Sequence, residues 1–463
     1  MSKSRLLFSA MSSGVGKTTV TCAVLRALRQ QGLSVAACKC GPDFIDPMFH
    51  RAVLQIPSVN LDLYLSSKNA VRQVLGAQLR QADLTVLEGV MGLYDGVGMS
   101  DEASTWAVAD VTQTPVVLIV KPTGAALSLA AQVRGICQFR KPSHVRALLL
   151  NPCSQALYAR LAPMLTAETG LPVAGYLPPM PENTFQSRHL GLVPPQERAG
   201  MCETLDDLGR QCAQTVDLAL LLCLADSAPP LDVPELPNPA RMMAGARIAV
   251  ARDEAFCFYY AENLSLLERS GAQLCPFSPL RDAALPSGCS GLYLGGGWPE
   301  LFAAPLSQNI AMRTAVQRAV QGGMPTLAEC GGYLYLLASL QDEAGSSFPM
   351  AGVLPGGSAR KGLRRFGYAE LVPQKDSFLL ARGDSLRVHC FHYWDSDMRG
   401  SDCIVTKPDG RMWACGFARD TLFASFAHLY FPGKPELARA FVEAADAYGK
   451  QCKAGGAKKE LTI

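Results

Sequence analysis

Residues 10–19 have the types and the spacing of a loop that binds phosphate. They read A-M-S-S-G-V-G-K-T-T and lie between an apolar stretch and a segment with a helical pattern. The glycines let successive backbone N–H groups turn toward phosphate oxygens, and the lysine supplies a cation. The glycine that usually begins such a loop is absent at both Ala10 and Met11. The sequence therefore predicts an ATP site formed by Gly14, Val15, Gly16, Lys17, Thr18 and Thr19.

Three acidic residues end or follow apolar stretches and could lie beside this loop. Glu88 ends the stretch L-T-V-L-E, whereas Asp43 and Asp46 lie in K-C-G-P-D-F-I-D-P, after another apolar stretch. Hydroxyl and carboxylate oxygens are the ligands that Mg²⁺ prefers, so we expect Thr18, Asp46 and Glu88 to hold the metal. The alternative for each aspartate is a turn-forming role in a Gly/Pro loop.

Cys330 is the cysteine whose surroundings predict a nucleophile. It follows the apolar stretch P-T-L-A-E and precedes two glycines, which is typical of a sharp strand-to-helix turn. A helix end would lower the pKa of the thiol, and His428 is the candidate base. We expect the N–H groups of an oxyanion hole at Gly296, Gly297 and Gly331. The alternative is a buried structural cysteine with an unrelated core histidine.

Short apolar stretches alternate with helix-length segments through the first half of the chain. We predict strands at 6–9, 35–39, 84–88, 116–120 and 147–150, and helices that include 18–31 and 125–139. Continuous runs of Val, Leu and Ile are typical of parallel strands that are covered on both faces. The pattern therefore predicts an α/β fold with a doubly wound parallel sheet.

Residues 226–245 contain five prolines and separate this half from a second one. Such a run suits neither a helix nor a central strand. Beyond it, expected strands at 247–251, 291–294 and 325–328 and a helix at 261–270 indicate a second α/β domain. We therefore expect domains at residues 1–225 and 246–448, a linker at 226–245 and a flexible tail at 449–463.

Composition limits the class of protein. The 463 residues are 49% hydrophobic with a formal net charge of +3, so large cores can form and nucleic-acid binding through bulk charge is not expected. The longest apolar run, residues 218–225, is too short to span a membrane, and we see no export signal. The 16 cysteines include no C-x-x-C pair, so we expect reduced thiols and a cytoplasmic protein.

Several longer motifs, taken in order, resemble the cobyrinic acid a,c-diamide synthase family. They are the phosphate loop, K-x-G-P-D-x-x-D, E-G-V-M-G-L-Y-D-G, R-H-L-G-L at 188–192, F-x-F-Y-Y-x-E-N-L at 256–264, G-G-G-x-P-E, A-E-C-G-G and the histidine near the end. The resemblance runs from about residue 5 to residue 445, which is nearly the whole chain.

The resemblance implies a dethiobiotin-synthetase-like ATP domain followed by a class I glutamine amidotransferase domain. The implied reaction belongs to cobalamin biosynthesis: a ligase amidates the a- and c-acetate carboxylates of a corrinoid, using ATP, glutamine and Mg²⁺. Cys330 is then the glutaminase nucleophile, which His428 activates. Asp43 and Asp95 fall in the metal and substrate region, and Asn151 falls where this fold contacts the base of ATP.

The sequence departs from the family pattern at a few positions. Tyr430 stands where many class I amidotransferases have a glutamate two residues after the histidine, although this branch generally lacks that glutamate too. The family's H-E-F-H-Y reads H-C-F-H-Y at 389–393, so Cys390 replaces a carboxylate. Trp298 replaces a usual tyrosine.

Alternatives remain open at this stage. Relatives of the family amidate sirohaem or nickel-sirohydrochlorin, so the substrate could be another tetrapyrrole. A non-enzymatic ATPase switch shares the G-K-T-T loop, and a synthetase with an inactive glutaminase domain would use only ammonium salts. Arg364 and Arg365, in a basic cluster, are candidates for binding substrate carboxylates, unless that cluster is a solvated loop. A homodimer is a further possibility, and no membrane partner is expected.

Overall fold

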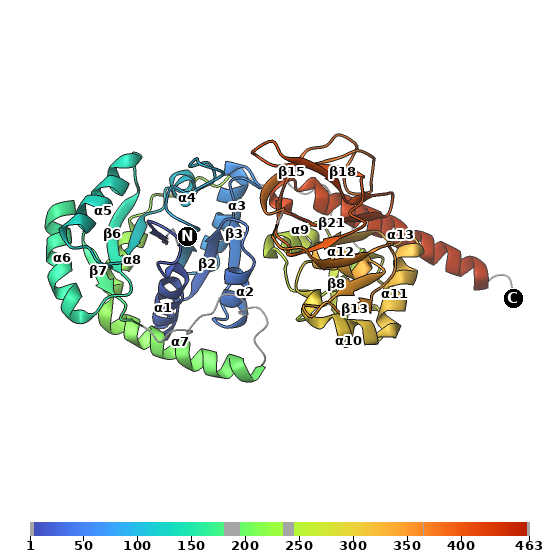
Figure 1. Cartoon of the computed structure of the whole chain (residues 1–463), viewed down its shortest axis with the longest axis horizontal. Coiled ribbons are helices and arrows are strands. Elements are labelled where there is room, and N and C mark those ends of the chain that lie inside the picture. The colour runs from blue at the N-terminus through green and yellow to red at the C-terminus, as the bar shows by residue number, and fades with distance from the viewer. Residues whose placement is uncertain (1–3, 180–194, 235–244, 364, 461–463) are drawn as a thin grey trace. The chain divides into compact units, whose positions relative to one another are not determined.

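The chain forms two compact units, which are drawn in Figure 1. This computed structural model describes residues 4–179, 195–234, 245–363 and 365–460. The units are Met1–Glu235 and Leu236–Ile463, so the division falls inside the proline-rich segment 226–245. Arg364 and the motif at 188–192 lie outside the described residues. Each unit buries apolar clusters of its own, as separate domains do.

A parallel sheet forms the centre of the first unit. Its strands are β1 (Arg5–Ala10), β2 (Val35–Cys40), β3 (Ser58–Leu61), β4 (Leu84–Glu88), β5 (Val116–Val120), β6 (Val145–Leu150) and β7 (Val173–Tyr176). Their order across the sheet is β3-β2-β4-β1-β5-β6-β7. The helices are α1 (Lys17–Gln30), α2 (Ile45–Ala52), α3 (Lys68–Leu79), α4 (Thr105–Thr112), α5 (Leu127–Phe139), α6 (Gln155–Thr169), α7 (Pro195–Thr215) and α8 (Leu218–Asp226).

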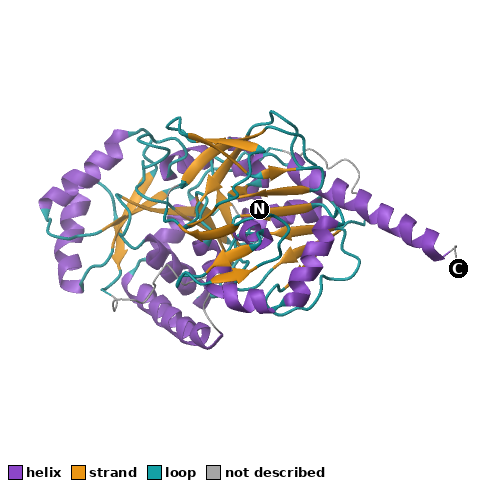
Figure 2. Cartoon of the chain, turned by 45° about the vertical axis from the view of Figure 1, so that its right-hand side comes forward, coloured by secondary structure: helices purple, strands orange, loops and turns teal. Residues whose placement is uncertain are grey.

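Helices cover both faces of this sheet, which explains why its central strands are buried and mostly apolar. One apolar cluster joins α1, α2, α7 and α8 to strand residues such as Phe8 and Val117. A second cluster joins α3, α4, α5 and α6 to residues of the opposite face, such as Leu7 and Leu118. Figure 2 shows the helices flanking the strands. The first unit is therefore the doubly wound α/β fold that the alternating pattern predicts.

The second unit combines a mostly parallel sheet with smaller sheets. The main sheet has the order β20-β21-β11-β10-β8-β9, made of β8 (Arg247–Ala251), β9 (Gln273–Phe277), β10 (Gly291–Leu294), β11 (Thr326–Glu329), β20 (Phe417–Ala418) and β21 (Leu422–Ser425). The other strands are β12 (Ser339–Gln341), β13 (Ser347–Pro349), β14 (Gly357–Arg360), β15 (Gly367–Pro373), β16 (Leu386–Cys390), β17 (Trp394–Ser396), β18 (Cys403–Thr406), β19 (Met412–Cys415) and β22 (Ala427–Leu429).

Helices again accompany the main sheet of the second unit. They are α9 (Ala261–Arg269), α10 (Ala303–Gln308), α11 (Ile310–Gln321), α12 (Gly331–Leu336) and α13 (Glu436–Glu460), with short 3₁₀ turns η1 (Pro299–Phe302) and η2 (Phe431–Gly433). Among the residues that the structure describes, every helix is too short or too polar to cross a membrane.

All eight predicted strands are confirmed within two residues at each end. The strands β4, β5, β8 and β10 have the predicted bounds. The sequence did not reveal β3 and β7, because S-V-N-L and V-A-G-Y are four residues long and carry too little periodicity. The sheets formed by β12 to β19 with β22 were also not predicted, since most of these strands have only three to five residues and their polar residues mask the apolar pattern.

Two local expectations are wrong. Asp46 lies in the first turn of α2 rather than in a loop, because Pro47 suits the start of a helix. The chain beyond residue 449 continues α13 as far as Glu460, where we expected a flexible tail. The four lysines, two alanines and one glutamine of residues 450–460 have high helix propensity, which outweighs two glycines.

Arg5 secures the start of β1, the strand that leads into the phosphate loop. Its side chain is buried, and its guanidinium donates to the carbonyl oxygens of Thr112 and Pro229, each at 2.8 Å. The variant Arg5→Ala leaves the buried carbonyl oxygen of Thr112 and the partly buried one of Pro229 without their donor, so we expect the free energy of unfolding to fall by about 2–4 kcal/mol. Urea unfolding measures this loss. The control Arg26→Ala, which removes a half-exposed pair with Asp206, should lose about 1 kcal/mol or less; equal losses would contradict the prediction.

Candidate active sites

The phosphate loop joins β1 to α1 with the backbone geometry that its glycines allow. Gly14 and Gly16 have φ angles of 76° and 86°, which other residues adopt only at a cost. Asn151, after β6, donates from Nδ2 to the carbonyl oxygen of Val15 at 2.8 Å. A Cβ atom at Gly16 would lie 2.3 Å from that nitrogen, so glycine lets the amide approach. The predicted loop residues and Asn151 thus lie together, with Thr19 following on α1.

Lys17 is the first residue of α1, and its ammonium group lies over the loop. Its Nζ donates to the carbonyl oxygens of Ser12 at 3.1 Å and Met91 at 2.6 Å. Burial, together with the ammonium of Lys39, lowers the pKa of Lys17 to about 8. A phosphate group at the loop would offset this cost of burying a cation.

A buried cluster of charged groups lies beside Thr18. The Thr18 hydroxyl donates to Glu88 Oε1 at 2.6 Å and lies 3.4 Å from Asp46 Oδ2. Lys39, near the end of β2, lies between the two carboxylates. Its Nζ is 2.5 Å from Asp46 Oδ2 and 2.8 Å from Glu88 Oε1. The structure therefore brings the three predicted metal ligands together and adds a lysine to them.

Mutual attraction holds these charges in the interior. Burial alone disfavours the Lys39 ammonium, but Asp46 and Glu88 outweigh burial and hold the pKa of Lys39 well above its usual range. Burial also opposes the Glu88 carboxylate, yet Lys39 and His50 hold the pKa of Glu88 below its ordinary value. Burial and the nearby charge of Glu88 raise the pKa of Asp46. Glu88 is thus the firmly ionised member of the pair.

The donor atoms of this cluster suit a hard cation. Thr18, Asp46 and Glu88 offer hydroxyl and carboxylate oxygens, which are the ligand types of Mg²⁺. Within the described part of the chain, no three His, Cys, Asp or Glu side chains are arranged to hold a metal on their own. Oxygens of a bound nucleotide would therefore have to complete the coordination, as is usual for Mg²⁺ at phosphate sites.

His50 and the two remaining acidic residues have different surroundings. His50, on α2, has Nε2 3.6 Å from Glu88 Oε2 and Nδ1 3.1 Å from the Ser58 hydroxyl. Asp43 Oδ1 accepts from the N–H of Ile45 at 2.8 Å, and Asp95 Oδ2 accepts from the N–H of Gly92 at 2.9 Å. Both aspartates thus form local turns, and for Asp43 this is the alternative given above.

A hollow of about 840 Å³ opens beside the phosphate loop. Its lining includes Ser12 and Gly14, the rings of Tyr94 and Phe139, and Lys121 after β5. The Tyr94 and Phe139 ring centroids are 5.2 Å apart. An apolar wall with a cation next to the phosphate loop suits a ligand that joins a large apolar body to carboxylates.

Cys330 lies at the predicted sharp turn between β11 and α12. Its φ of 47° and ψ of −104° lie outside the regions that non-glycine residues favour. Its N–H donates to the carbonyl oxygen of Ser425 at 2.8 Å, and its Sγ lies 3.8 Å from the carbonyl oxygen of Phe391. We expected a helix end to lower the pKa of this thiol, but burial raises it. The thiol therefore needs a base to become nucleophilic.

His428 lies three residues after Ser425, on β22. This strand pairs with β16, where His389 stands opposite His428. A Cβ atom at Gly296 would lie 2.6 Å from His428 Cε1, so the imidazole packs directly on the glycine loop. Burial, with His389 and His392 nearby, lowers the pKa of His428 to about 3. The imidazole is thus neutral, which is the form of histidine that can act as a base, although burial weakens its affinity for the proton.

The predicted oxyanion glycines are close to one another. A Cβ atom at Gly331 would lie 3.1 Å from the nitrogen of Gly297. The N–H of Gly332 donates to the carbonyl oxygen of Gly295 at 2.9 Å, and the Tyr259 hydroxyl accepts from the N–H of Gly295 at 2.8 Å. The glycine loop after β10 and the turn after β11 therefore meet at one edge of the sheet, beside the thiol.

Arg365 is already paired within its own unit. Its Nη1 lies 2.6 Å from Asp395 Oδ2, and Arg399 Nε lies 2.8 Å from the other oxygen of that carboxylate. A contact between Arg365 and substrate stays a prediction.

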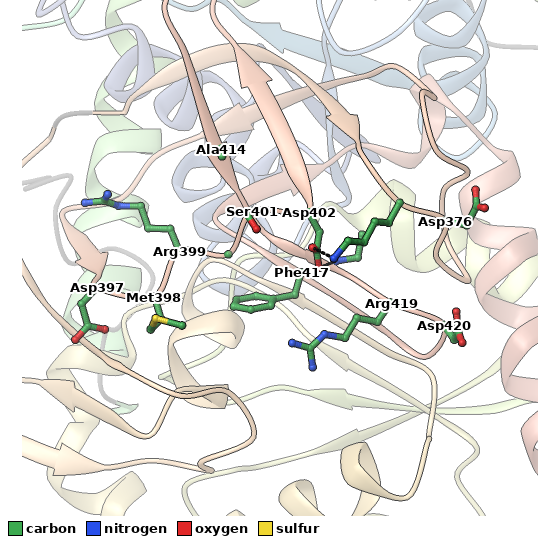
Figure 3. Close-up of a pocket in the computed structure, with 13 residues that line it drawn as sticks. Asp376, Asp397, Met398, Arg399, Ser401, Asp402, Ala414, Phe417, Arg419 and Asp420 are labelled. Atoms are coloured by element: carbon green, nitrogen blue, oxygen red, sulfur yellow. Dashed lines mark hydrogen bonds and ion pairs between the residues drawn. The ribbon is translucent and has the colours of Figure 1, made fainter.

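A separate hollow of about 760 Å³ lies in the second unit (Figure 3). Lys375, Arg399, Asp402 and Arg419 contribute to its wall, which does not include the thiol or the imidazole described above. Lys375 Nζ pairs with Asp402 Oδ1 at 2.7 Å. This hollow is therefore distinct from the thiol site.

Comparison with known proteins covers both units. Residues 6–222 match a family model described as the CobQ/CobB/MinD/ParA nucleotide binding domain, and residues 247–436 match the CobB/CobQ-like glutamine amidotransferase domain. The cobyrinate a,c-diamide synthase of Priestia megaterium is 36% identical over 465 residues, which cover 99% of each chain. That of Salmonella typhimurium is 38% identical, covering 95% of this chain and 97% of its own.

The chain belongs to the cobyrinate a,c-diamide synthase family. As a member it is an enzyme, a ligase that combines an ATP-binding domain with a glutamine amidotransferase domain. Among solved structures, the MinD cell division protein of Aquifex aeolicus matches 46% of this chain and 97% of its own, with 13% identity and a TM-score of 0.31, a likeness too low to carry an argument.

Some residues of these sites had no role in the sequence analysis. Lys39 and His50 lie in the motif that contains Asp43 and Asp46, and Glu329 lies in A-E-C-G-G. Their types alone did not separate a site residue from a turn or surface residue. A lysine and a glutamate at the ends of apolar strands are the signal that could have indicated them, because charged residues are rarely buried unless paired.

Lys39 provides a test of the charged cluster. In Lys39→Met, Asp46 and Glu88 remain buried without their cation, so we expect the free energy of unfolding to fall by about 3–5 kcal/mol near neutral pH. Unpaired buried carboxyls have raised pKa values in the folded state, so protonation favours folding and the loss should shrink as the pH falls. Urea unfolding at about pH 8 and pH 5 measures both effects. Arg411→Met, which removes an exposed pair with Asp409, is the control; a Lys39 loss that does not depend on pH would be inconsistent with this account.

Proposed function

We propose that this enzyme amidates the a- and c-acetate carboxylates of a corrinoid, using ATP and ammonia released from glutamine. The observation that carries the proposal is the presence of two chemically distinct sites in a chain that matches cobyrinate a,c-diamide synthases over nearly its full length. One site suits phosphate and a hard cation, and the other suits a thiol nucleophile.

The first unit would activate the carboxylate. The γ-phosphoryl group of ATP passes to a carboxylate oxygen of the acceptor, which yields ADP and an acyl phosphate. Lys17 and the N–H groups of the loop offset the phosphate charge. Thr18, Asp46 and Glu88 would hold Mg²⁺, which supplies charge neutralisation when it is bound. Ammonia then attacks the acyl carbon, and inorganic phosphate leaves.

The second unit would supply the ammonia. Cys330 Sγ attacks the side-chain amide carbon of glutamine while His428 takes the thiol proton and passes it to the leaving ammonia. Water then hydrolyses the thioester, with His428 as base, and glutamate leaves. The N–H groups at Gly296, Gly297 and Gly331 would stabilise the oxyanion. Both groups start neutral, so this route does not require a preformed thiolate.

The identity of the macrocycle is testable directly. The relatives' names point to cobyrinate, whereas sirohaem and nickel-sirohydrochlorin are the alternative acceptors. Each amidation replaces OH by NH₂, so mass spectrometry counts the steps. Incubation of the enzyme with ATP, glutamine and each macrocycle should give a diamide from the corrinoid. If the enzyme amidates another tetrapyrrole and not the corrinoid, the proposed substrate is wrong.

Cys330→Ser should abolish amidation with glutamine and spare amidation with ammonium salt at raised pH. The serine hydroxyl is a much weaker nucleophile, whereas the first unit keeps its own chemistry. Product formation with each nitrogen donor, followed by mass spectrometry, measures the difference. Loss of activity with both donors would contradict the proposal that one site releases ammonia and the other site uses it.

Lys17→Ala should stop amidation with either nitrogen donor. Loss of a cation at the transferring phosphate typically costs about 3–4 kcal/mol of transition-state stabilisation, or roughly a 10²–10³-fold lower kcat. Glutamine hydrolysis, assayed as glutamate release, controls for the integrity of the second unit. Ammonia-dependent turnover near the wild-type rate would show that the loop does not carry the chemistry.

A further inference from the structure

The backbone just after His428 is held by two buried side chains. The N–H of Leu429 donates to Glu329 Oε1 at 2.8 Å, and Asn263 Nδ2 donates to the carbonyl oxygen of Leu429 at 2.7 Å. The N–H of Phe431 donates to Asn263 Oδ1 at 2.7 Å. Side chains from β11 and α9 therefore supplement the pairing of β22 with β16 at this point.

These two side chains are themselves well supported. Asn263 is fully buried, and Glu329 is 3% exposed. Glu329 Oε2 accepts from the Tyr293 hydroxyl at 2.9 Å, so both carboxylate oxygens are used. Burial raises the pKa of Glu329 to about 8, and these two hydrogen bonds offset part of the cost of burying it.

Glu329 connects these contacts to the thiol site through its position in the chain. Glu329 ends β11 and is the residue before Cys330, so one side chain links the strand of the nucleophile to the strand of the imidazole. Tyr430, two residues after His428, packs its ring on Tyr260 with centroids 5.0 Å apart. The Tyr430 hydroxyl also donates to Glu262 Oε1 at 3.5 Å, so this tyrosine contacts the start of α9. The carboxyl group that binds the backbone after His428 comes from Glu329.

We propose that Glu329 and Asn263 are positioning residues of the thiol site, which set the place of His428 relative to Cys330 by holding Leu429 from both sides. Neither residue takes part in the bond changes. The inference rests on the proposed roles of Cys330 and His428, because a positioning residue matters only where the imidazole acts as the base.

Kinetics with two nitrogen donors test this inference. Displacement of a catalytic group by about 1 Å can cost about 10²-fold, so Glu329→Ala should lower kcat with glutamine by about that factor. The KM for glutamine and the ammonia-dependent rate should stay within about threefold, since neither uses His428. Glu329→Gln keeps an acceptor for the Leu429 N–H and should recover to within about tenfold of the wild-type kcat.

Asn263→Ala should give the same pattern as Glu329→Ala. Because both residues act through Leu429, the double variant should lose less than the product of the two single losses. Asp402→Ala is a matched control. Asp402 is a buried carboxylate of the same unit that accepts from the N–H of Ala418 at 3.2 Å, and its loss should leave glutamine-dependent kcat unchanged.

A second readout does not depend on turnover. The rate at which iodoacetamide alkylates Cys330 is measured by mass spectrometry on the peptide that contains it. His428→Ala should slow this reaction near neutral pH, because the base that takes the thiol proton is gone. Glu329→Ala should slow it to a similar extent, and Glu329→Gln should restore it.

Three results would overturn the inference. The first is a kcat with glutamine within threefold of wild type in both Glu329→Ala and Asn263→Ala. The second is an equal loss of rate with glutamine and with ammonia in these variants. The third is an unchanged rate of Cys330 alkylation in Glu329→Ala. If Glu329→Ala does not fold, Tyr293→Phe tests the inference, because it removes only one hydrogen bond to Glu329. It should lower kcat with glutamine and leave the ammonia-dependent rate unchanged. An unchanged kcat with glutamine would count against the inference. Cys330→Ser tests the proposed function separately. If this variant still uses glutamine, both the proposed function and the positioning role are wrong. If Cys330→Ser does not use glutamine but Glu329→Ala uses it at the wild-type rate, only the positioning role is wrong.

Discussion

Parallel strands end at the same edge of their sheet, and both sites of this chain depend on that constraint. In the first unit β2, β4 and β1 are neighbours, so Lys39 stands opposite Glu88 and the loop after β1 lies beside them. In the second unit β10 and β11 are neighbours, so the glycine loop and the turn at Cys330 meet. Helices on both faces leave this edge as the place where polar side chains can gather.

A charge buried at this edge of a sheet is costly unless it is paired or hydrogen-bonded. The two units reduce this cost in different ways. The first unit places an ammonium between two carboxylates, which keeps a strongly polar cluster ready for phosphate and a hard cation. The second unit keeps its reactive groups neutral, because burial raises the pKa of the Cys330 thiol and lowers that of the His428 imidazole. The buried carboxyl group of Glu329, beside the thiol, is satisfied by hydrogen bonds instead of by a cation.

The two designs match the two proposed reactions. Phosphoryl transfer builds up negative charge that fixed cations can stabilise, so a permanently charged site is useful. Attack by a thiol on an amide instead moves one proton from the thiol to the imidazole and on to the leaving ammonia, so the distance between thiol and imidazole matters more than charge. The side chains around Leu429 are the structural means by which the second unit could fix that separation.

Local patterns in the sequence were sufficient for the doubly wound fold, the phosphate loop, and the turn at Cys330, because strand periodicity and glycine placement are properties of neighbouring residues. Those patterns also predicted that Thr18, Asp46 and Glu88 lie close together, as they do, since carboxyl ends of parallel strands share an edge. Lys39 and Asn263 were different. The register of β2 and β4 decides that Lys39 is buried between two carboxylates, and this burial and pairing set its pKa. Asn263 finds its partners at Leu429 and Phe431, which are far away in the sequence. Only the tertiary structure brings such residues together.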